Sequence, residues 1–456
     1  MSGVCIENSL TEIEQIMKSI SIYIHIPFCV KKCQYCDFLS APADSRAQEV
    51  YLRALKQEIR EQAARYREYE VQTVFIGGGT PTAVPCEKLC EVLKTVFTCY
   101  RVNPQTEISM EANPGTVTKE ALLAYRKAGI NRLSIGLQSA DDGELKLLGR
   151  IHTYRDFLQT YRWAQEAGFT NINLDIMSAL PGQSVENYKK TLETVLSLRP
   201  QHISAYSLIV EEGTPFYEKY GQESEKLQAT GEKQPDLPSE EEEREMYALT
   251  EKLLATAGYH RYEISNYALP GRECRHNRVY WKRGNYVGFG LGAASMVENV
   301  RFENTRKMQE YLAEYAGVPG VEPVSADAAQ GDEQVLSNEQ ELSLCEDTHS
   351  ENAQVLSTWE DGHSKKEHTF SKNVHPLSPQ EQMEETMFLG LRLTEGVSKA
   401  EFHRQFGVSM EQIYGEIIQE NIAQGLLADE AGYVCLTREG MDLSNYVMAQ
   451  FLLDEV

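Results

Sequence analysis

Three cysteines near the start of the chain have the residue type and spacing best suited to chemistry. Cys29, Cys33 and Cys36 form a Cys-x3-Cys-x2-Cys pattern directly after an apolar run, 22–26, that we expect to be a β-strand. Thiolates on one short loop can bind a soft metal centre together. A closed 4Fe-4S cluster takes four cysteines and a structural zinc site takes four ligands. Three cysteines would therefore leave one iron of a cluster open to a small molecule.

Two other uses of these cysteines stay open when only their spacing is considered. A disulfide set would leave one of the three without a partner and would need an oxidising compartment. A zinc site would need a fourth ligand, for which His25 is the local candidate. Residues 1–20 lack the basic segment followed by an apolar core that marks an export signal, so we expect reduced thiols in the cytoplasm.

Further polar and glycine residues follow the C-terminal ends of successive predicted strands. These strands cover 22–26, 74–76, 107–111, 132–138, 171–176 and 202–208, and amphipathic helical patterns separate them. The cysteine loop follows the first strand and Gly77–Gly79 follow the second, while Glu111, Gln138 and Asp175 lie at or near the ends of the next three. Parallel α/β folds place their sites at the C-terminal strand ends, so we expect one shared cavity.

The repeated alternation of strand and helix predicts an α/β fold with parallel strands and helical crossovers. Six units are too few for a closed eight-stranded barrel, and an open, partial (β/α)6 barrel fits them. We divide the chain into a lead-in (1–20), the partial barrel (21–238), a flanking region rich in aromatic residues and glycine (239–318), an acidic low-complexity insertion (319–378) and a small, mostly α, winged-helix-like C-terminal domain (379–456).

The charge of the chain argues against a nucleic-acid partner. The formal net charge is −24, whereas phosphate binding requires a basic face. Two stretches, 211–245 with 12 acidic and 4 basic residues and 318–380 with 12 acidic and 3 basic residues, contribute −17 of this charge. The remaining body is only mildly acidic. No run of about 18 apolar residues occurs, so we expect no membrane span.

The sequence around the cysteines resembles the radical-SAM family. Within that family, the matching segments resemble the oxygen-independent coproporphyrinogen III oxidase group: Ile24-His-Ile-Pro-Phe-Cys29, Gly77-Gly-Gly-Thr-Pro-Thr82, Gly136-Leu-Gln-Ser139 and Leu180-Pro-Gly-Gln183. The resemblance runs from about residue 21 to 315 and resumes at about 379. It implies a 4Fe-4S cluster on Cys29, Cys33 and Cys36, S-adenosylmethionine (SAM) on the open iron, and an electron donor such as a flavodoxin or ferredoxin.

The same resemblance implies which residues contact SAM. They are Tyr23, Gly78, Gly79, Thr80, Glu111, Gln138, Arg150 and Asp175. Glycine has no Cβ, so its backbone can approach the methionine end of SAM closely. Glu111 can accept hydrogen bonds from the ribose hydroxyls or from the ammonium group.

Two branches of this group differ just after the third cysteine. The oxidase branch has another cysteine two residues further on, where this chain has Phe38. The heme-chaperone branch has Cys-Asp-Phe there and a His-Asn-x-x-Tyr-Trp motif, which His276-Asn277-Arg-Val-Tyr280-Trp281 matches. The resemblance therefore implies a heme chaperone that delivers heme to hemoproteins, with coproporphyrinogen III oxidase as the alternative. It also implies a scaffold able to cleave SAM reductively.

The second motif has the residue types that heme binding needs. Neutral imidazole is a common axial ligand of heme iron, which makes His276 a candidate. Tyr280 and Trp281 offer flat apolar surface to a macrocycle. Basic residues around the motif could pair with heme propionates: Arg272, Arg275, Arg278, Lys282 and Arg283. Spacing alone is more typical of a packed turn with His276 hydrogen-bonded and Trp281 in the core, and only the resemblance favours heme binding. A respiratory hemoprotein as recipient would bring this cytoplasmic chain to the inner face of the membrane.

Overall fold

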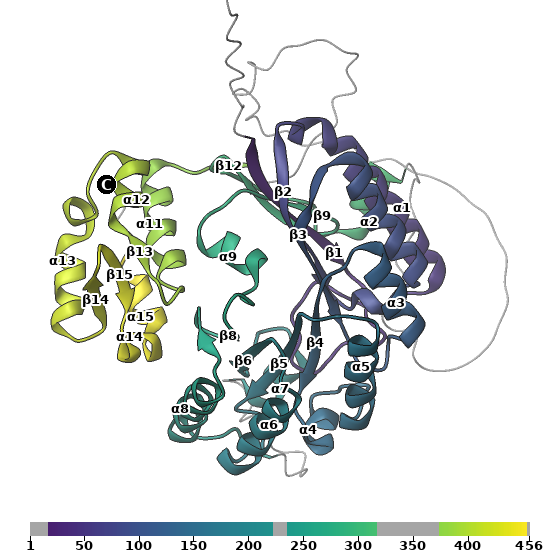
Figure 1. The fold of residues 1–456 in the computed structure, drawn as a ribbon, viewed down its shortest axis with the longest axis horizontal. Helices are drawn as coiled ribbons and strands as arrows, with labels where there is room; N and C mark the ends of the chain where they lie inside the picture. The colour runs from purple at the N-terminus through teal and green to yellow at the C-terminus, as the bar shows by residue number, and fades with distance from the viewer. Residues whose placement is uncertain (1–16, 222–234, 317–373, 454–456) are drawn as a thin grey trace, which may run out of the picture.

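A curved mixed sheet forms the centre of the protein. The computed structural model describes residues 17–221, 235–316 and 374–453 (Figure 1). Within them, a 12-stranded sheet has the order β12-β11-β10-β9-β1-β2-β3-β4-β5-β6-β8-β7. Its parallel centre consists of β1 (Lys18–Ile26), β2 (Tyr69–Gly78), β3 (Arg101–Ala112), β4 (Arg132–Gln138), β5 (Ile172–Ser178) and β6 (His202–Ser207). The predicted partial barrel of six parallel strands is confirmed.

The region after β6 extends both edges of this sheet, which its sequence pattern did not reveal. Short strands add to the edges: β7 (His260–Arg261), β8 (Asn266–Ala268), β9 (Tyr286–Phe289), β10 (Ala294–Val297), β11 (Val300–Glu303) and β12 (His375–Pro376). β8 pairs antiparallel with β6, whereas β9 pairs parallel with β1. Strand β1 also begins at Lys18, before the predicted start at Ile22. The two edges are therefore built from chain that follows the barrel.

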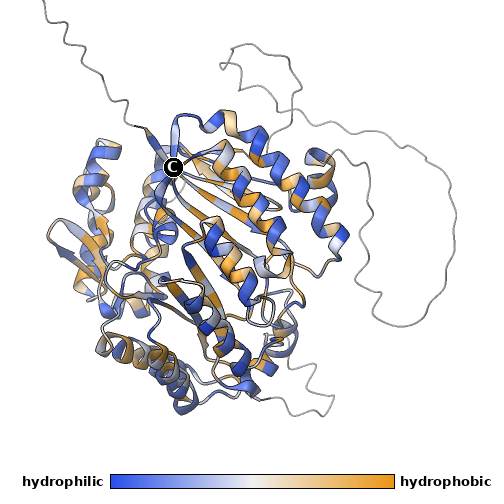
Figure 2. Ribbon diagram, turned by 45° about the vertical axis from the view of Figure 1, so that its right-hand side comes forward, coloured by the Kyte–Doolittle hydropathy of each residue, from blue (hydrophilic) through white to orange (hydrophobic). Residues whose placement is uncertain are grey.

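Helices cover the outer face of the curved sheet (Figure 1). They are α1 (Ser45–Gln62), α2 (Cys86–Cys99), α3 (Lys119–Ala128), α4 (Asp142–Leu147), α5 (Tyr154–Glu166), α6 (Val185–Leu198), α8 (Glu240–Thr256) and α10 (Met308–Tyr315), with 3-10 turns at Ala63–Tyr66 and Pro81–Ala83. The short helix α7 (Pro215–Tyr220) lies against the cysteine loop, where the Phe216 N–H donates to the Gln34 carbonyl at 3.0 Å. Apolar strands lie beneath helices of mixed polarity (Figure 2). Ser184 caps α6, accepting from the Asn187 N–H at 3.2 Å.

The last part of the chain forms a smaller unit with its own core. It contains α11 (Pro379–Gly390), α12 (Lys399–Phe406), α13 (Met410–Ala423), α14 (Arg438–Asp442), α15 (Ser444–Ala449) and a sheet of β13 (Val397–Ser398), β15 (Tyr433–Leu436) and β14 (Leu427–Glu430). Phe402, Tyr414 and Phe451 are fully buried in this core. Strands β14 and β15 form a hairpin, and the two short helices α14 and α15 follow it. Most of the predicted acidic insertion lies outside the described residues.

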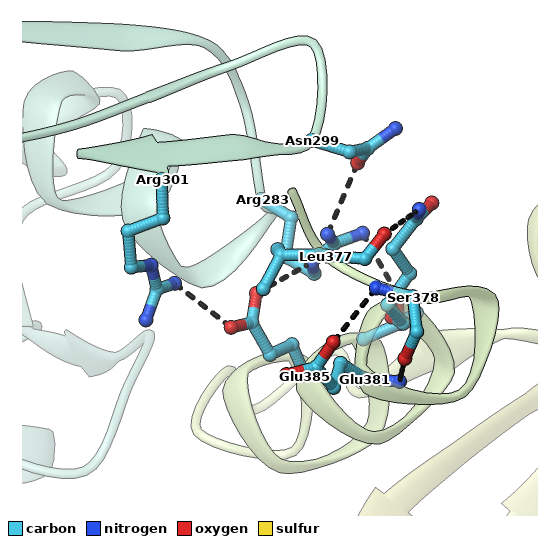
Figure 3. A network of polar contacts seen from close by, with 9 residues as sticks. Arg283, Asn299, Arg301, Leu377, Ser378, Glu381 and Glu385 are labelled. Carbon is cyan, nitrogen blue, oxygen red and sulfur yellow. Dashed lines mark hydrogen bonds and ion pairs between the residues drawn. The ribbon is translucent and has the colours of Figure 1, made fainter. Parts of the chain in front are cut away.

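Helix α9 (Arg275–Trp281) joins the barrel to this C-terminal unit. It lies between the sheet and the C-terminal unit and packs against both β2 and α11 (Figure 1). Next to it, Glu385 of α11 accepts a hydrogen bond from Arg283 (3.1 Å) and forms an ion pair with Arg301 (2.9 Å), as Figure 3 shows. Among the described helices, none combines the length and apolarity that crossing a membrane requires.

Candidate functional site

A cavity of about 380 Å³ runs through the open side of the barrel. It is of the size of small-molecule sites. It brings together ten of the predicted site residues: Cys29, Cys33, Cys36, Gly78, Gly79, Thr80, Glu111, Gln138, Arg150 and Asp175. These residues come from the cysteine loop and from β2, β3, β4 and β5 or the turns that follow them, because alternate residues of each strand point inward. The expectation of one shared cavity is confirmed.

The cysteine loop is held in place from several sides. The Cys29 N–H donates to the Ala41 carbonyl at 3.2 Å, and the Gln34 N–H donates to Leu148 at 3.0 Å. The hydroxyl of Thr80 donates to Cys29 Sγ at 3.4 Å, and Arg150 donates to Cys33 Sγ at 3.6 Å. Such donors stabilise negative charge on sulfur. Burial raises the pKa of the Cys36 thiol to about 11, so a bound metal would have to displace its proton.

The cysteines fit a cluster better than either alternative use. All three are free thiols, so no disulfide forms among them. No three metal-ligating side chains of the described residues converge on a single ion position. His25 offers no fourth zinc ligand, because its Nδ1 contacts the Tyr23 hydroxyl at 3.0 Å and its Nε2 contacts the Leu39 carbonyl at 2.9 Å. Thiolates that share a cavity wall without meeting at one point suit a cubane, in which each binds a different iron.

The glycine segment owes its composition to close backbone packing. Gly78 has φ +109°, and a Cβ there would lie 2.4 Å from the His25 ring. A Cβ on Gly79 would lie 2.7 Å from the Phe28 carbonyl oxygen. The N–H groups of Gly78, Gly79 and Thr80 already donate to Glu111 Oε2, Ile26 O and Phe28 O. The polar backbone atoms that this segment can offer a ligand are therefore carbonyl oxygens, which suit an ammonium group.

Two carboxyl groups at the cavity have raised pKa values. Burial raises the pKa of Glu111 to about 8, the charge of Asp175 adds to this rise, and the hydrogen bond from the Gly78 N–H opposes it. Burial also raises the pKa of Asp175, against hydrogen bonds from Ser134 (3.0 Å) and Asn173 (2.7 Å). Both carboxyl groups keep part of their surface open to the cavity. The site thus holds a proton that a cationic ligand can displace.

Of the remaining predicted SAM contacts, Arg150 and Gln138 line the cavity and Tyr23 does not. Arg150 donates to the Gly136 carbonyl at 2.8 Å and contacts Asn113. Gln138 has φ +69°, unusual for a residue with a side chain, and accepts from the Tyr206 hydroxyl at 3.0 Å. This strained end of β4 turns its side chain toward the ligand space. Tyr23, in contrast, is not part of the cavity wall and contacts His25 behind the glycine segment.

The second motif does not present His276 as a ligand, contrary to our expectation. His276 is buried, and both ring nitrogens are hydrogen-bonded, Nδ1 to the Thr73 hydroxyl at 2.7 Å and Nε2 to the Tyr280 hydroxyl at 2.9 Å. Its ring stacks on Phe75 with centroids 5.2 Å apart. Burial lowers its pKa to about 3, which keeps the ring neutral. No nitrogen of His276 is free for iron in this conformation.

Three of the basic residues near this motif are paired with carboxylates. Arg278 and Lys282 pair with Glu395 at 3.0 and 2.7 Å. Arg283 pairs with Glu385 (Figure 3). Trp281 is not an open apolar surface, because the guanidinium of Arg392 lies 4.3 Å from its ring centroid. The motif therefore joins α9 to the C-terminal unit, and its expected pairing with heme propionates would compete with these contacts.

Sequence reasoning missed several residues of the cavity wall. Within the motif, Asn277 faces the cavity although its neighbour His276 does not. Arg132, Asn173 and Ser204 also line it. The alternation of inward residues along β4, from Arg132 through 134 and 136 to 138, was the signal that could have found the first of these.

The chain resembles known proteins over almost all of its length. Residues 23–195 match the Radical SAM superfamily, and residues 377–443 match the HemN C-terminal domain. Heme chaperone HemW of Bacillus subtilis is 34% identical over 435 residues, which are 95% of this chain and 99% of the relative. The chain belongs to the HemW family. The heme chaperone HemW of Lactococcus lactis is 31% identical over 97% of this chain and 99% of its own length.

Other relatives of the HemW family match a shorter part of the chain. HemW of Escherichia coli K12 is 38% identical over 279 residues, 61% of this chain and 70% of that protein. Among solved structures, coproporphyrinogen III oxidase (HemN) from Escherichia coli, described as a radical SAM enzyme, has a TM-score of 0.74 at 20% identity, covering 96% of this chain and 91% of that one. The likeness to the HemN structure shows a shared fold. As a radical-SAM family, HemW implies a 4Fe-4S cluster and SAM.

Proposed function

We propose that this protein is a cytoplasmic heme chaperone on a radical-SAM scaffold, which binds heme and passes it to a hemoprotein, such as a respiratory enzyme at the inner face of the membrane. The observation that carries the proposal is the end-to-end similarity to relatives named heme chaperone HemW, at 34% identity over 95% of this chain. Phe38, where the oxidase branch would have another cysteine, supports it. The proposal keeps the five regions of the chain set out above, with bounds at 1–20, 21–238, 239–318, 319–378 and 379–456.

In this proposal Cys29, Cys33 and Cys36 hold the 4Fe-4S cluster. The bound cluster would supply an electron, received from a flavodoxin or ferredoxin, for reductive cleavage of SAM. Thr80 and Arg150 orient the loop by donating to two of the sulfurs. The carbonyl oxygens of the glycine segment and the carboxyl group of Glu111 receive the ammonium and hydroxyl groups of SAM. Gln138 and Asp175 close the other side of the ligand space.

The mouth of the cavity suits heme better than the surroundings of His276. Phe38 is 62% exposed and lines the mouth, and Val30, on the same cysteine loop, is 58% exposed. Large exposed apolar side chains at a cavity are typical of a binding surface. Lys31, also at the mouth, can pair with a propionate. An apolar surface with a neighbouring cation fits a flat macrocycle that carries carboxylates.

One experiment separates the chaperone from the oxidase. The cluster is reconstituted anaerobically, and the protein is then mixed with hemin in one sample and with coproporphyrinogen III, SAM and a reductant in another. We expect a heme absorption band with hemin, its transfer to an apo-hemoprotein, and no protoporphyrinogen. Formation of protoporphyrinogen would favour the oxidase instead, and a protein that binds no hemin would contradict the proposal.

The location at the mouth has its own test. Phe38→Ser and Lys31→Glu should each weaken hemin binding about tenfold, the effect of losing roughly 1.4 kcal/mol of apolar or charged contact. Phe97→Ser is the matched control, because Phe97 is a partly exposed aromatic residue on α2, at the outer face. Equal affinities in all three variants would place the heme elsewhere while leaving the chaperone function intact.

A further inference from the structure

The base of the cavity contains an arginine whose Nε has no hydrogen-bond partner among the described residues. Arg132, the first residue of β4, is only 2% exposed and lines the cavity. Its Nε is buried and makes no hydrogen bond, and no ion pair of this arginine occurs in the described part of the chain. Buried charges in proteins are as a rule paired or bound to a ligand. An unpaired guanidinium that faces empty space therefore needs an explanation.

This base lies far from the cluster end of the cavity. Inward residues alternate along β4 from Arg132 to Gln138, and six residues of strand span roughly 20 Å. Gln138 is at the end where the cysteines and the glycine segment lie, whereas Arg132 is at the opposite end. SAM held at the cysteines would leave the base for another molecule. Arg132 thus lies at the other end of β4 within the same continuous cavity.

The carboxylates near Arg132 are engaged elsewhere. Glu107 accepts hydrogen bonds from the N–H groups of Arg275 (3.3 Å) and His276 (3.2 Å) at the start of α9. Asp175 accepts from Ser134 and Asn173. Both attract Arg132 from a distance, but neither forms an ion pair with it. The guanidinium keeps its donors available.

Neutral polar groups complete the base. Asn266 of β8 and Asn277 of α9 both line it, and Asn266 Oδ1 is buried without a hydrogen-bond partner. A planar anion can bind a guanidinium through two hydrogen bonds. Asn266 Oδ1 can accept a hydrogen bond from a donor elsewhere on the ligand, because the Asn266 NH2 already donates to Glu263. The negative charges of Glu107 and Asp175 nearby favour a monoanion over a doubly charged phosphate. The chemistry of the base therefore matches a carboxylate.

We propose that the base of the barrel cavity binds a small carboxylate-bearing molecule, with Arg132 as its anchor and Asn266 and Asn277 as further contacts. These three residues are not among those assigned to SAM or to the mouth proposed for heme. The subsite gives the scaffold a second small-molecule ligand within the barrel.

The test uses the full chain with its cluster reconstituted. Acetate, propionate and succinate are titrated by calorimetry, with inorganic phosphate for comparison. We expect a carboxylate to bind with a 1:1 stoichiometry, and Arg132→Gln to weaken it about tenfold to a hundredfold, the usual effect of losing a charged hydrogen bond. Arg126→Gln is the control, because Arg126 is an exposed arginine on α3. A wild-type protein that binds no carboxylate would overturn the proposal.

Two further variants and one spectroscopic measurement complete the test. Arg132→Lys retains the charge without the fork of donors and should bind with intermediate affinity. Asn277→Ala, which leaves the arginine in place, should weaken binding several-fold even if Arg132→Gln fails to fold. The electron-spin spectrum of the reduced cluster should still respond to SAM in each variant, since SAM contacts the other end. If carboxylate binding and the response to SAM disappear together, the base is part of the SAM site and the proposal is wrong.

Discussion

Arg283 donates to Glu385 across the junction between the barrel and the C-terminal unit, with 3.1 Å between Nε and Oε2. The two side chains are 4% and 9% exposed, so this ion pair is nearly buried. Arg301 forms an ion pair with the other oxygen of the same carboxylate (Figure 3). Two cations from the barrel side thus share one anion of α11, close to the helix that carries the second motif.

Removal of this carboxylate should loosen the junction. Glu385→Ala leaves Arg283 buried without its anion, which should lower the free energy of unfolding by about 3 kcal/mol. Denaturant unfolding measures it. Glu395→Ala is the control, because Glu395 is 44% exposed and its pairs with Arg278 and Lys282 should contribute less than about 1 kcal/mol. Equal losses in the two variants would mean that burial of the Glu385 pair has no special role.

The glycine segment gives a second prediction. Gly78→Ala combines a left-handed φ with a Cβ 2.4 Å from the His25 ring, so we expect the glycine turn to shift and the reconstituted iron content to fall severalfold. Gly168→Ala has a similar φ of +88° but no atom within 4 Å of its Cβ. It should cost only about 1 kcal/mol of stability and leave the iron content unchanged. An unchanged iron content in Gly78→Ala would show that the turn tolerates a side chain.

Much of this architecture follows from local sequence patterns. The strands and helices of the barrel have regular apolar periodicity, and the residues that follow each strand end must meet because parallel strands share one edge. The sequence therefore predicts that the cysteine loop, Glu111 and Asp175 share one cavity. Each of them lies at or near the end of a recognisable strand, so local sequence is enough to predict its position.

Residues positioned by distant contacts could not be found in this way. Strands β8 to β12 are two to four residues long, so they carry too little periodicity to be recognised. His276 looked like an open ligand, but its partners Thr73 and Tyr280 and the stacking ring of Phe75 are set by packing of α9 against β2. Arg278 and Arg283, beside it, pair with glutamates that lie more than 100 positions later in the chain.

Glu58 predicts a pH-dependent stability. This buried residue of α1 accepts from Gly290 N (2.9 Å), Asn304 (2.6 Å) and Tyr311 (2.6 Å), and burial raises its pKa from 4.5 to about 7. The folded state binds this proton more tightly than the unfolded state. Stability from Glu58 is therefore fully present below about pH 4.5 and declines as the pH rises to about 7, by about 3 kcal/mol.

The measurement for Glu58 is denaturant unfolding at several pH values. Glu58→Gln should flatten the decline between pH 4.5 and 7, at the cost of one mismatched donor. Glu91→Gln is the control, since Glu91 is an exposed carboxylate paired with Lys56. The quantity to follow is the free energy of unfolding of the wild type minus that of Glu58→Gln at each pH. If this difference rises between pH 4.5 and 7, the pKa of Glu58 is not raised in the folded state.

His276 should prove to be a structural residue. His276→Ala removes two buried hydrogen bonds and the stacking on Phe75, so the free energy of unfolding should fall by about 3 kcal/mol. Tyr280→Phe, which removes one of these bonds and keeps the ring, should cost about 1 kcal/mol. Hemin affinity per folded molecule should stay within about twofold in both. Loss of the heme absorption band in a His276→Ala protein that is fully folded would restore His276 as the ligand.

Glu111 predicts that SAM binding releases a proton. With a pKa of about 8, this carboxyl group is largely protonated at pH 7 in the free protein, and contact with the ammonium and hydroxyl groups of SAM favours its ionised form. SAM affinity should therefore rise with pH up to about 8 and level off above it. Calorimetry in two buffers of different ionisation enthalpy should detect close to one proton released at pH 7. Glu111→Gln keeps the shape of the side chain but should release fewer protons and lose the pH dependence, apart from what Asp175 contributes. Proton uptake by the wild type, or equal release in the variant, would show that Glu111 does not face the cationic part of SAM.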